Sequence, residues 1–492
     1  MRMLFKFTLL SVLVYFLSWL AVYKTNINKL SIQSEDTLPA MFLPVTILKE
    51  GTLYADTYYQ MIAEKYPHPD DKSGMLGLTP FYFRKIQQPR VGSGDSPGVT
   101  ENSSVNSVSG NRFLQTHYIS AFPIITGLLA VPIYAIPILS GMEITWENLT
   151  LLVHLTASII VGLSGGFLYL LLVRHFQLDD KKAWLLTAIY LFGTINYALI
   201  SQALWQHGTV QLFTILGLYY LFNGLSDERQ DHLTPLFFAG LFISLATLTR
   251  PTVGIVWVLL YTLIYFKYKT SIVSLFKSSV FFTLGLAPVL AFFLWYNKTF
   301  YLTLANQGYS DQVGDSWLSK FPEGFLGLWL SPSKGILIYS PIFLFSFIGI
   351  YLIFKRKHWR SDYRYWVFVL IVLLHTLVMG KWKHWYGGWS FGYRMASDII
   401  PFMILLTVPY MQSYIFDKTK KIFIGLAVFS ILVQVFGIIF FDGIWHSAYD
   451  RGFEDTGWLW SVRDSEFAFN IRRILVKLNI LERACPQCLP RS

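Results

Sequence analysis

A succession of long apolar segments with almost no charge is the feature that most constrains this 492-residue chain. About 20 helical residues span the hydrocarbon core of a bilayer, so each segment can cross it, or nearly so with tilt. The segments lie roughly at 4–23, 149–173, 183–200, 208–224, 233–249, 251–266, 278–296, 336–354, 365–380, 397–416 and 422–441. Only 14% of the residues are charged, against about 25% in a soluble domain. The pattern excludes an ordinary soluble, disordered or fibrous protein and predicts an all-α polytopic membrane protein.

A further apolar segment, 119–140, either crosses the membrane or lies in its interface. It contains Pro123, Pro132 and Pro137, and each proline removes a backbone donor and clashes with the preceding turn. If the segment does not cross, fifteen Lys and Arg residues lie in the short cytoplasmic loops and seven in the short loops of the other face. Because Lys and Arg favour the cytoplasmic side, we predict about eleven transmembrane helices, or twelve if 119–140 crosses.

This topology divides the chain into a transmembrane domain, 1–441, and an external C-terminal tail, 442–492. A long first external loop covers 24–148, and a second covers 297–335. Within the first loop, apolar residues recur at helical spacing over 37–50. That spacing predicts a short helix along the membrane surface.

Charge and cysteine content limit the partners. The net charge of +11 fits cytoplasmic loops held at anionic lipid, and no basic soluble module indicates nucleic-acid binding. Residues 91–111 are rich in Gly, Ser and Asn, which predicts a mobile segment. Cys485 and Cys488 form a C-x-x-C pair in the tail. The pair is an incidental feature, half of a zinc site or a small disulfide.

Several polar side chains stand at the external ends of predicted spans. Glu35 and Asp36 follow the first span, where they either cap the surface helix or supply a general base. His207, in ALWQHGT, is either a hydrogen-bonded structural group or a ligand for phosphate or metal. Arg250, in TLTRPT, either reaches to the interface or points inward to an anion.

The stretch 381–398, KWKHWYGGWSFGYRMASD, holds the densest group of cations and aromatic rings. It is either an aromatic belt with interfacial cations or a platform that binds sugar and phosphate. Gly387 and Gly388 favour the second interpretation, since glycine lets the backbone approach a ligand closely. Arginine also suits bidentate contact with phosphate. The candidates for binding are Lys383, His384, Trp389, Tyr393 and Arg394, with Lys334 of SPSKGILIYSP at the mouth of a neighbouring span.

The order of these features resembles the GT-C glycosyltransferases, integral membrane enzymes that use polyprenyl-phosphate-linked sugars. The outline covers about 1–440, and further local similarity lies in EDTLPAMFLPVTILKEGTL, the proline-rich 121–137, SQALWQHG, LTRPT, SPSKGILIYSP, WYGGWSFGYR and WLWSVRD. The class includes protein mannosyltransferases and the lipid A aminoarabinose transferase. The chain lacks a clear F-E-K-P-P motif like that of the latter. The resemblance implies a GT-C-like catalytic bundle with interfacial helices in the first external loop.

The resemblance also implies roles for the matching residues. The acidic motif after the first span carries the catalytic base in that class, which here means Asp36, with Glu35 beside it. His207 would face the same cavity, and Arg250 and Arg394 would face the lipid phosphate. No metal ligand is assigned, and the need for a divalent cation is left open.

The sequence therefore predicts an inverting glycosyltransferase that moves a sugar from polyprenyl phosphate to a lipid, glycan or protein acceptor. The predicted location is a bacterial inner membrane, with the active site facing outside. Two other classes share the polytopic shape. One is a transporter or lipid flippase, which places ionisable groups near mid-membrane. The other is a membrane glycan polymerase or ligase.

Overall fold

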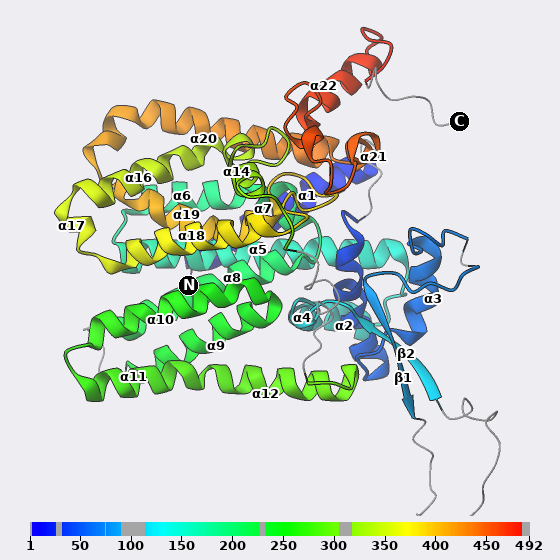
Figure 1. Ribbon diagram of the computed structural model, residues 1–492, viewed down its shortest axis with the longest axis horizontal. Helices are drawn as coiled ribbons and strands as arrows, with labels where there is room; N and C mark the ends of the chain where they lie inside the picture. The colour runs from blue at the N-terminus through cyan, green and yellow to red at the C-terminus, as the bar shows by residue number, and fades with distance from the viewer. Residues whose placement is uncertain are drawn as a thin grey trace, which may run out of the picture.

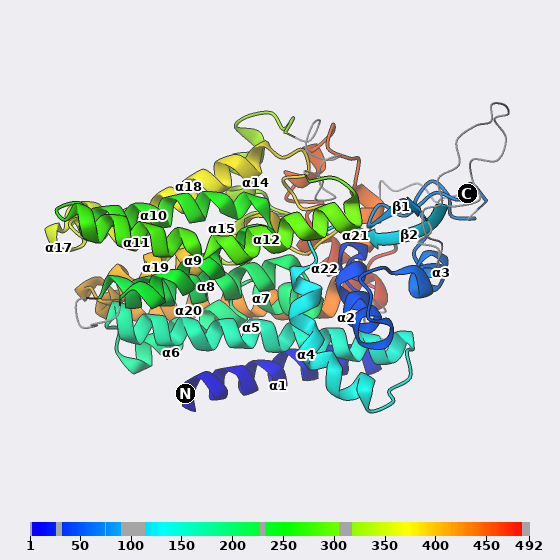
Figure 2. The same ribbon diagram turned by 90° about the horizontal axis from the view of Figure 1, so that it is seen from below.

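The protein is a mostly helical bundle elongated along one axis in the computed structural model (Figures 1 and 2). The structure describes residues 2–25, 32–73, 75–89, 114–226, 232–304 and 317–484. The C-terminal residues 485–492, which include the tail cysteines, and the whole predicted mobile segment 91–111 lie outside the described residues. The long helices of the bundle are α1 (Arg2–Lys24), α5 (Trp146–Phe176), α6 (Asp180–Phe192), α8 (Gln206–Leu225), α9 (Leu233–Thr249), α10 (Gly254–Tyr268), α11 (Ile272–Leu284), α12 (Leu286–Tyr296), α16 (Leu344–Lys355), α18 (Tyr363–Lys381), α19 (Ile400–Met411) and α20 (Tyr414–Phe440).

Short helical turns join or extend these helices. They are α7 (Ile195–Ala198), η2 (Ile200–Gln202), η3 (Pro251–Val253), η4 (Asn297–Tyr301), α14 (Glu323–Leu330), α15 (Ile336–Tyr339), η5 (Pro341–Phe343), α17 (Lys357–Arg360) and η6 (Arg394–Ile399). A second group of elements gathers at one end of the bundle (Figure 1): η1 (Glu35–Thr37), α2 (Leu38–Glu50), α3 (Asp56–Lys65), β1 (Phe83–Pro89), β2 (Leu114–Ser120), α4 (Ile125–Leu139), α21 (Ile444–Tyr449), η7 (Gly457–Leu459) and α22 (Glu466–Lys477).

Seven helical segments in the described part of the chain are long and apolar enough to cross a membrane. They are Met3–Lys24, Trp146–Phe176, Pro251–Tyr268, Ile272–Tyr301, Tyr363–Lys381, Arg394–Met411 and Tyr414–Phe440. The pair from α6 to η2, bent by 43°, would make an eighth, and α4, α9 and η5–α16 are shorter apolar helices. The chain is therefore a multi-pass, helical membrane protein, as predicted. The count of eleven spans stays a prediction.

Helix α8 shows why composition alone undercounts the helices of such a bundle. It coincides with the predicted span 208–224, yet it carries His207, Gln211 and Asn223. Most of its residues are buried, and it packs against α5 and α9 rather than lying on the outer surface. A helix surrounded by protein can keep polar groups that a lipid-facing helix cannot, because its neighbours satisfy them.

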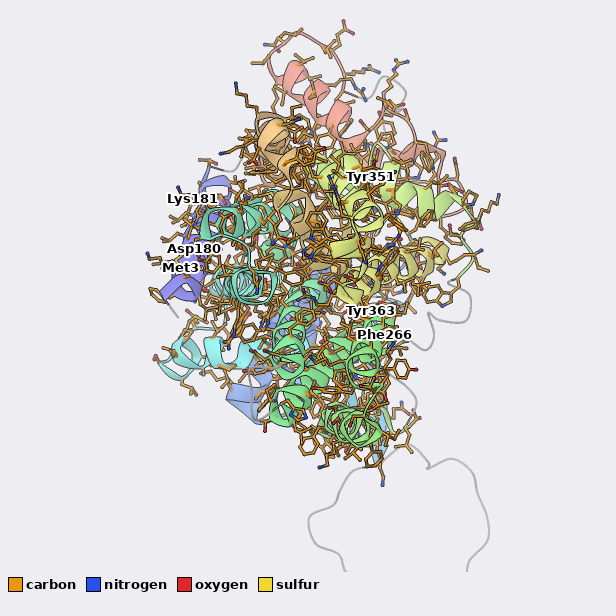
Figure 3. The ribbon with its side chains drawn as sticks, turned by 90° about the vertical axis from the view of Figure 1, so that its left-hand side faces the viewer. Met3, Asp180, Lys181, Phe266, Tyr351 and Tyr363 are labelled. Carbon is orange, nitrogen blue, oxygen red and sulfur yellow. The ribbon has the colours of Figure 1, made fainter. Side chains whose placement is uncertain are left out.

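The loops with the greater positive charge lie at one end of the bundle, opposite the end that carries α2, α3 and α22 (Figures 1 and 3). Figure 3 views that end and labels residues from five helices: Met3, Asp180, Lys181, Phe266, Tyr351 and Tyr363. The helix connections that charge assigns to one side of a membrane therefore share one end of the fold.

Helices α2 and α4 pair with each other at the opposite end. Helix α4 runs across the bundle direction, since it is seen nearly end-on in Figure 1 and upright in Figure 2. The predicted surface helix 37–50 is α2, but its apolar face packs on protein: Leu38, Met41, Phe42 and Val45 are buried. The two helices touch at Gly127, where a Cβ would lie 2.8 Å from Leu43 Cδ2. A small residue at this position therefore sets their separation.

A two-stranded antiparallel sheet, β1 with β2, was not predicted. Its register pairs Phe83 with Ser120 at one end and Pro89 with Leu114 at the other. Asp56 at the start of α3 fixes β2, because its carboxylate accepts the backbone N–H of Tyr118 at 2.7 Å. A short two-stranded sheet buries few apolar residues, so it leaves little periodic pattern in the sequence.

The course of α4 makes a topological prediction. Cysteines introduced at Gln115 and Glu143, on either side of α4, should both react with a membrane-impermeant maleimide added outside intact cells. A cysteine at Lys181 should react only after permeabilisation, with Cys485 and Cys488 replaced by serine throughout. Labelling of positions 115 and 143 from opposite sides would show that α4 crosses the membrane.

Candidate functional site

A cavity of about 380 Å³ lies where the end of the bundle meets η1, α2 and the segment before α4. Its apolar walls include Pro39, Leu43, Phe81, Phe122, Ile124, Leu204, Pro251, Met379, Trp382 and Met395. Its polar lining includes Asp36, His207, Arg250, His384 and Arg394, all of which the sequence nominated. Segments about 360 residues apart in the chain thus meet around one largely apolar space with a few convergent charges, which is typical of a ligand site.

Asp36 and Arg394 form an ion pair across the cavity. Arg394 Nη1 donates to Asp36 Oδ2 at 2.7 Å, with side chains 16% and 29% exposed, respectively. Asp36 is held in place because Ser34 Oγ accepts its backbone N–H and Gln33 donates to the carbonyl of Ala198 at 2.9 Å. The pair is partly exposed, so it can be exchanged for contacts to a ligand.

The guanidinium of Arg394 has further binding capacity. It lies over the Trp205 ring, 4.8 Å from the centroid, an arrangement that favours a cation. Its Nε is buried without a hydrogen-bond partner among the described residues, as are Trp205 Nε1 and Thr252 Oγ1 of the same cavity. Buried polar groups without partners are uncommon. Three such donors around one cavity indicate a place for a polar ligand.

A second cluster lies behind the cavity wall and centres on Asp398. His207 Nδ1 is 2.9 Å from Asp398 Oδ1, and Arg250 Nη1 is 3.4 Å from Oδ2. His375 Nε2 lies 3.5 Å from the same oxygen. Arg250 Nη1 lies 2.5 Å from Nδ1 and 2.7 Å from Nε2 of His207, so the guanidinium packs against the imidazole ring. The Asp398 side chain is 1% exposed, so this carboxylate positions Arg250 and His207 and does not itself line the cavity.

The local backbone explains why Arg250 reaches the cavity. Pro251 disfavours helical geometry at the residue before it, and Arg250 is extended, with φ −144° and ψ 112°. Helix α9 therefore ends at Thr249, and the Arg250 side chain leaves the helix axis. On the opposite wall, Gly387, Gly388 and Gly392 all have positive φ, a conformation that glycine adopts without strain. These turns bring Gly388 to the cavity and deliver Arg394.

His384 lines the cavity as an uncharged group. Burial, and then the neighbouring Lys383, lower the pKa of its imidazole below the usual value. Its Nδ1 lies 3.2 Å from the hydroxyl of Tyr386. Lys383 itself lies outside the cavity, with its ammonium 5.2 Å from the centroid of the Phe453 ring. Of this adjacent pair, only the histidine is placed to contact a ligand.

Lys334 was predicted to bind substrate, but the structure places it beneath the cavity wall. Its ammonium is buried and donates to the carbonyls of Gly388 and Ser390 and to His446 Nε2, the last at 3.0 Å. Burial lowers the pKa of Lys334 to about 8. The ammonium of Lys334 therefore stabilises the turn that contains Gly388. Its N–H groups bond to protein atoms, so they are not directed at a ligand.

Three other predicted residues also lie away from the cavity lining. Trp389 is 52% exposed, and its indole N–H donates to Asp450 at 2.8 Å. Tyr393 is buried, and its hydroxyl is 2.8 Å from Ser340 Oγ. The pKa of Glu35 is raised by burial and then by the charge of Asp36. All three residues are close in sequence to residues that line the cavity, but their own side chains do not line it.

Four important residues were not predicted as site residues: Trp205, Trp382, His375 and Asp398. Asp398 and His375 carried a usable signal, since ionisable residues inside apolar segments mark functional sites by default. Trp382 and Asp398 also lie within the stretch 381–398 that the sequence singled out, although neither was named as a binding residue. Trp205 carried no such signal, because aromatic residues are frequent throughout this chain.

Comparison with known proteins adds no identification. No family model, curated protein or solved structure is significantly similar to this chain. Within the described residues, no three His, Cys, Asp or Glu side chains are arranged to hold a metal ion.

Loss of the buried Asp398 carboxylate should destabilise the protein much more than loss of an exposed carboxylate. Asp398→Asn should lower the free energy of unfolding by about 3–5 kcal/mol, because it leaves Arg250 buried without its counter-charge. As a matched control, Asp455→Asn breaks the exposed pair with Arg451 and should leave the melting temperature unchanged. Thermal unfolding in nanodiscs measures both variants. Equal shifts would show that Asp398 does not stabilise the cluster.

Proposed function

We propose that the protein is a glycosyltransferase that moves a sugar from a polyprenyl-phosphate-linked donor to an acceptor. The observation that carries this proposal is the meeting of Asp36, Arg250 and Arg394 at one largely apolar cavity at the end of a membrane bundle. An apolar cavity with cations suits a lipid phosphate, since guanidinium groups bind phosphate oxygens in a bidentate manner. The sugar then lies between the phosphate and the carboxylate.

The chemistry follows from these placements. An acceptor hydroxyl attacks the anomeric carbon of the sugar while Asp36 accepts its proton. The bond between the anomeric carbon and the phosphate oxygen breaks, and its electron pair leaves with the phosphate. Arg250 and Arg394 stabilise the charge that grows on this leaving group. A single displacement of this kind inverts the anomeric centre.

The ion pair between Asp36 and Arg394 suggests an order of binding. While Asp36 is paired with Arg394, its Oδ2 accepts a hydrogen bond from the guanidinium and is not free to accept a proton from the acceptor hydroxyl. A donor phosphate competes for the same guanidinium and releases Asp36 to act on the acceptor. The donor therefore binds first and the acceptor second.

The proposal includes a location. The chain has about eleven spans in a bacterial inner membrane, with the cavity facing outside, and it accepts a lipid, glycan or protein. The separation of the more positive end of the bundle from the end with the cavity supports this orientation. The same site would also serve a membrane glycan polymerase or ligase, which only acceptor analysis separates.

A transporter or lipid flippase is the second candidate. The observation that favours it is the buried set of Asp398, His207 and His375, since transporters place ionisable groups within the membrane. The two candidates separate in proteoliposomes: movement of labelled lipid-linked sugar between leaflets without formation of a glycosylated product would favour the transporter.

Asp36→Asn should lower the rate of transfer by about 100-fold or more, because it removes the general base. The measurement uses purified protein in nanodiscs, a panel of radiolabelled polyprenyl-phosphate sugars and membrane extract as the acceptor. Glu35→Gln is the matched control and should retain transfer, since Glu35 does not line the cavity. Equal transfer by Asp36→Asn and wild type would remove Asp36 from the mechanism.

The order of binding gives a separate prediction. Asp36→Asn should bind undecaprenyl phosphate more tightly than wild type, because Arg394 no longer has a competing carboxylate. Arg394→Gln should bind it more weakly. Native mass spectrometry with undecaprenyl phosphate alone measures both variants without any need for the sugar. Weaker binding by Asp36→Asn would contradict competition for Arg394.

A further inference from the structure

Helix α22, at the end of the bundle that carries the cavity, has an apolar stripe along one face. Phe467, Ile471, Ile474 and Leu478 recur at intervals of three and four residues, the spacing of one helical face. Two of these residues are exposed, Ile471 at 50% and Leu478 at 63%, while Phe467 and Ile474 are partly buried. Ile480 and Leu481 extend the exposed apolar surface beyond the helix.

The stripe begins on the membrane bundle and continues outward from it. The Phe467 ring lies 5.4 Å from that of Phe436 in α20. From this contact α22 extends past the outline of α20 (Figure 1). The outer face of α20 is itself apolar and exposed, with Phe429 at 53% and Leu432 at 58%, as expected where a span meets lipid. The stripe therefore continues an existing lipid-facing surface.

The polar face of α22 is fixed by ion pairs, which set the rotation of the helix. Arg473 Nη2 donates to Asp442 at 2.6 Å, and its Nη1 reaches the other oxygen at 3.0 Å. Arg472 lies 3.4 Å from Asp464. At the first turn, buried Glu466 accepts from the hydroxyl of Tyr339 at 3.0 Å. These contacts hold the cations toward the protein and the stripe away from it.

We propose that α22 and residues 478–481 lie on the membrane surface as an amphipathic anchor, with Ile471, Ile474 and Leu478 in the lipid. A helix with one apolar face and basic residues beside it binds in the plane of the interface. Arg463, Lys477 and Arg483 are exposed next to the stripe, which matches anionic headgroups. The apolar face of α22 thus contacts the outer leaflet of the bilayer.

This anchor sits close to the glycine turn that lines the cavity. Glu466 contacts Tyr339, whose neighbour in the same segment, Lys334, donates to Gly388 and Ser390. The chain of contacts runs from the lipid surface to Gly388 in the cavity wall. The anchor therefore sets the height of the cavity mouth relative to the headgroups, whatever reaction the cavity performs.

Fluorescence quenching by brominated lipid tests the proposal on the full-length protein. Cys485 and Cys488 are replaced by serine, and single cysteines at Ile471 or Leu478 carry an environment-sensitive label in nanodiscs of phosphatidylcholine and phosphatidylglycerol. Leu432 on α20 is the lipid-facing control, and exposed Glu454 is the water-facing control. All four positions are exposed, so the labelled variants should fold.

Labels at Ile471 and Leu478 should be quenched as strongly as the label at Leu432 when the acyl chains carry bromine. The label at Glu454 should be unaffected. Quenching at 471 and 478 no greater than at 454 would overturn the proposal. Protection of these labels in a particle of twice the expected mass would also overturn it, because a second copy would then cover the stripe.

Discussion

The absence of water in the hydrocarbon core is the constraint on which this structure depends. Every backbone polar group in that region must be satisfied within the protein, so the spans are helices and irregular backbone is confined to the ends. The same constraint sorts the charged side chains. Lys and Arg gather at the loop ends, and the ionised groups that stay inside, such as Asp398 and Arg250, are paired.

The cavity arises where the helices stop being regular. Helix α6 bends into α7 and η2, α9 ends at Thr249 just before Arg250, and α19 is preceded by the turns of η6. At each break the regular helical hydrogen bonds stop, and a side chain points away from the helix axis. Because the breaks share one end of the bundle, their side chains converge, and α2 and the segment before α4 complete the lining of the cavity.

The multi-pass helical class could be predicted because the bilayer imposes a length and a composition that appear directly in the sequence. The convergence of Asp36, His207, Arg250 and Arg394 on one side followed from assigning charge to loops. The structure then separates Arg394 from Lys334, two cations with similar sequence settings. Arg394 faces the cavity, while the donors of Lys334 are used by backbone carbonyls. This difference depends on tertiary contacts between residues 54 to 358 positions apart, which local patterns do not carry.

The two arginines of the cavity are held in different ways, and this difference gives them different roles. Arg250 is paired with Asp398, whose side chain is 1% exposed, whereas Arg394 is paired with Asp36, which is 29% exposed. Breaking the buried pair leaves an uncompensated charge in the protein interior, and that costs several kcal/mol. Breaking the exposed pair costs much less, because water and ligand replace the lost contact. Arg250 therefore provides a positive charge that is fixed in the cavity lining. Arg394 can exchange its contact with the Asp36 carboxylate for a contact with a phosphate.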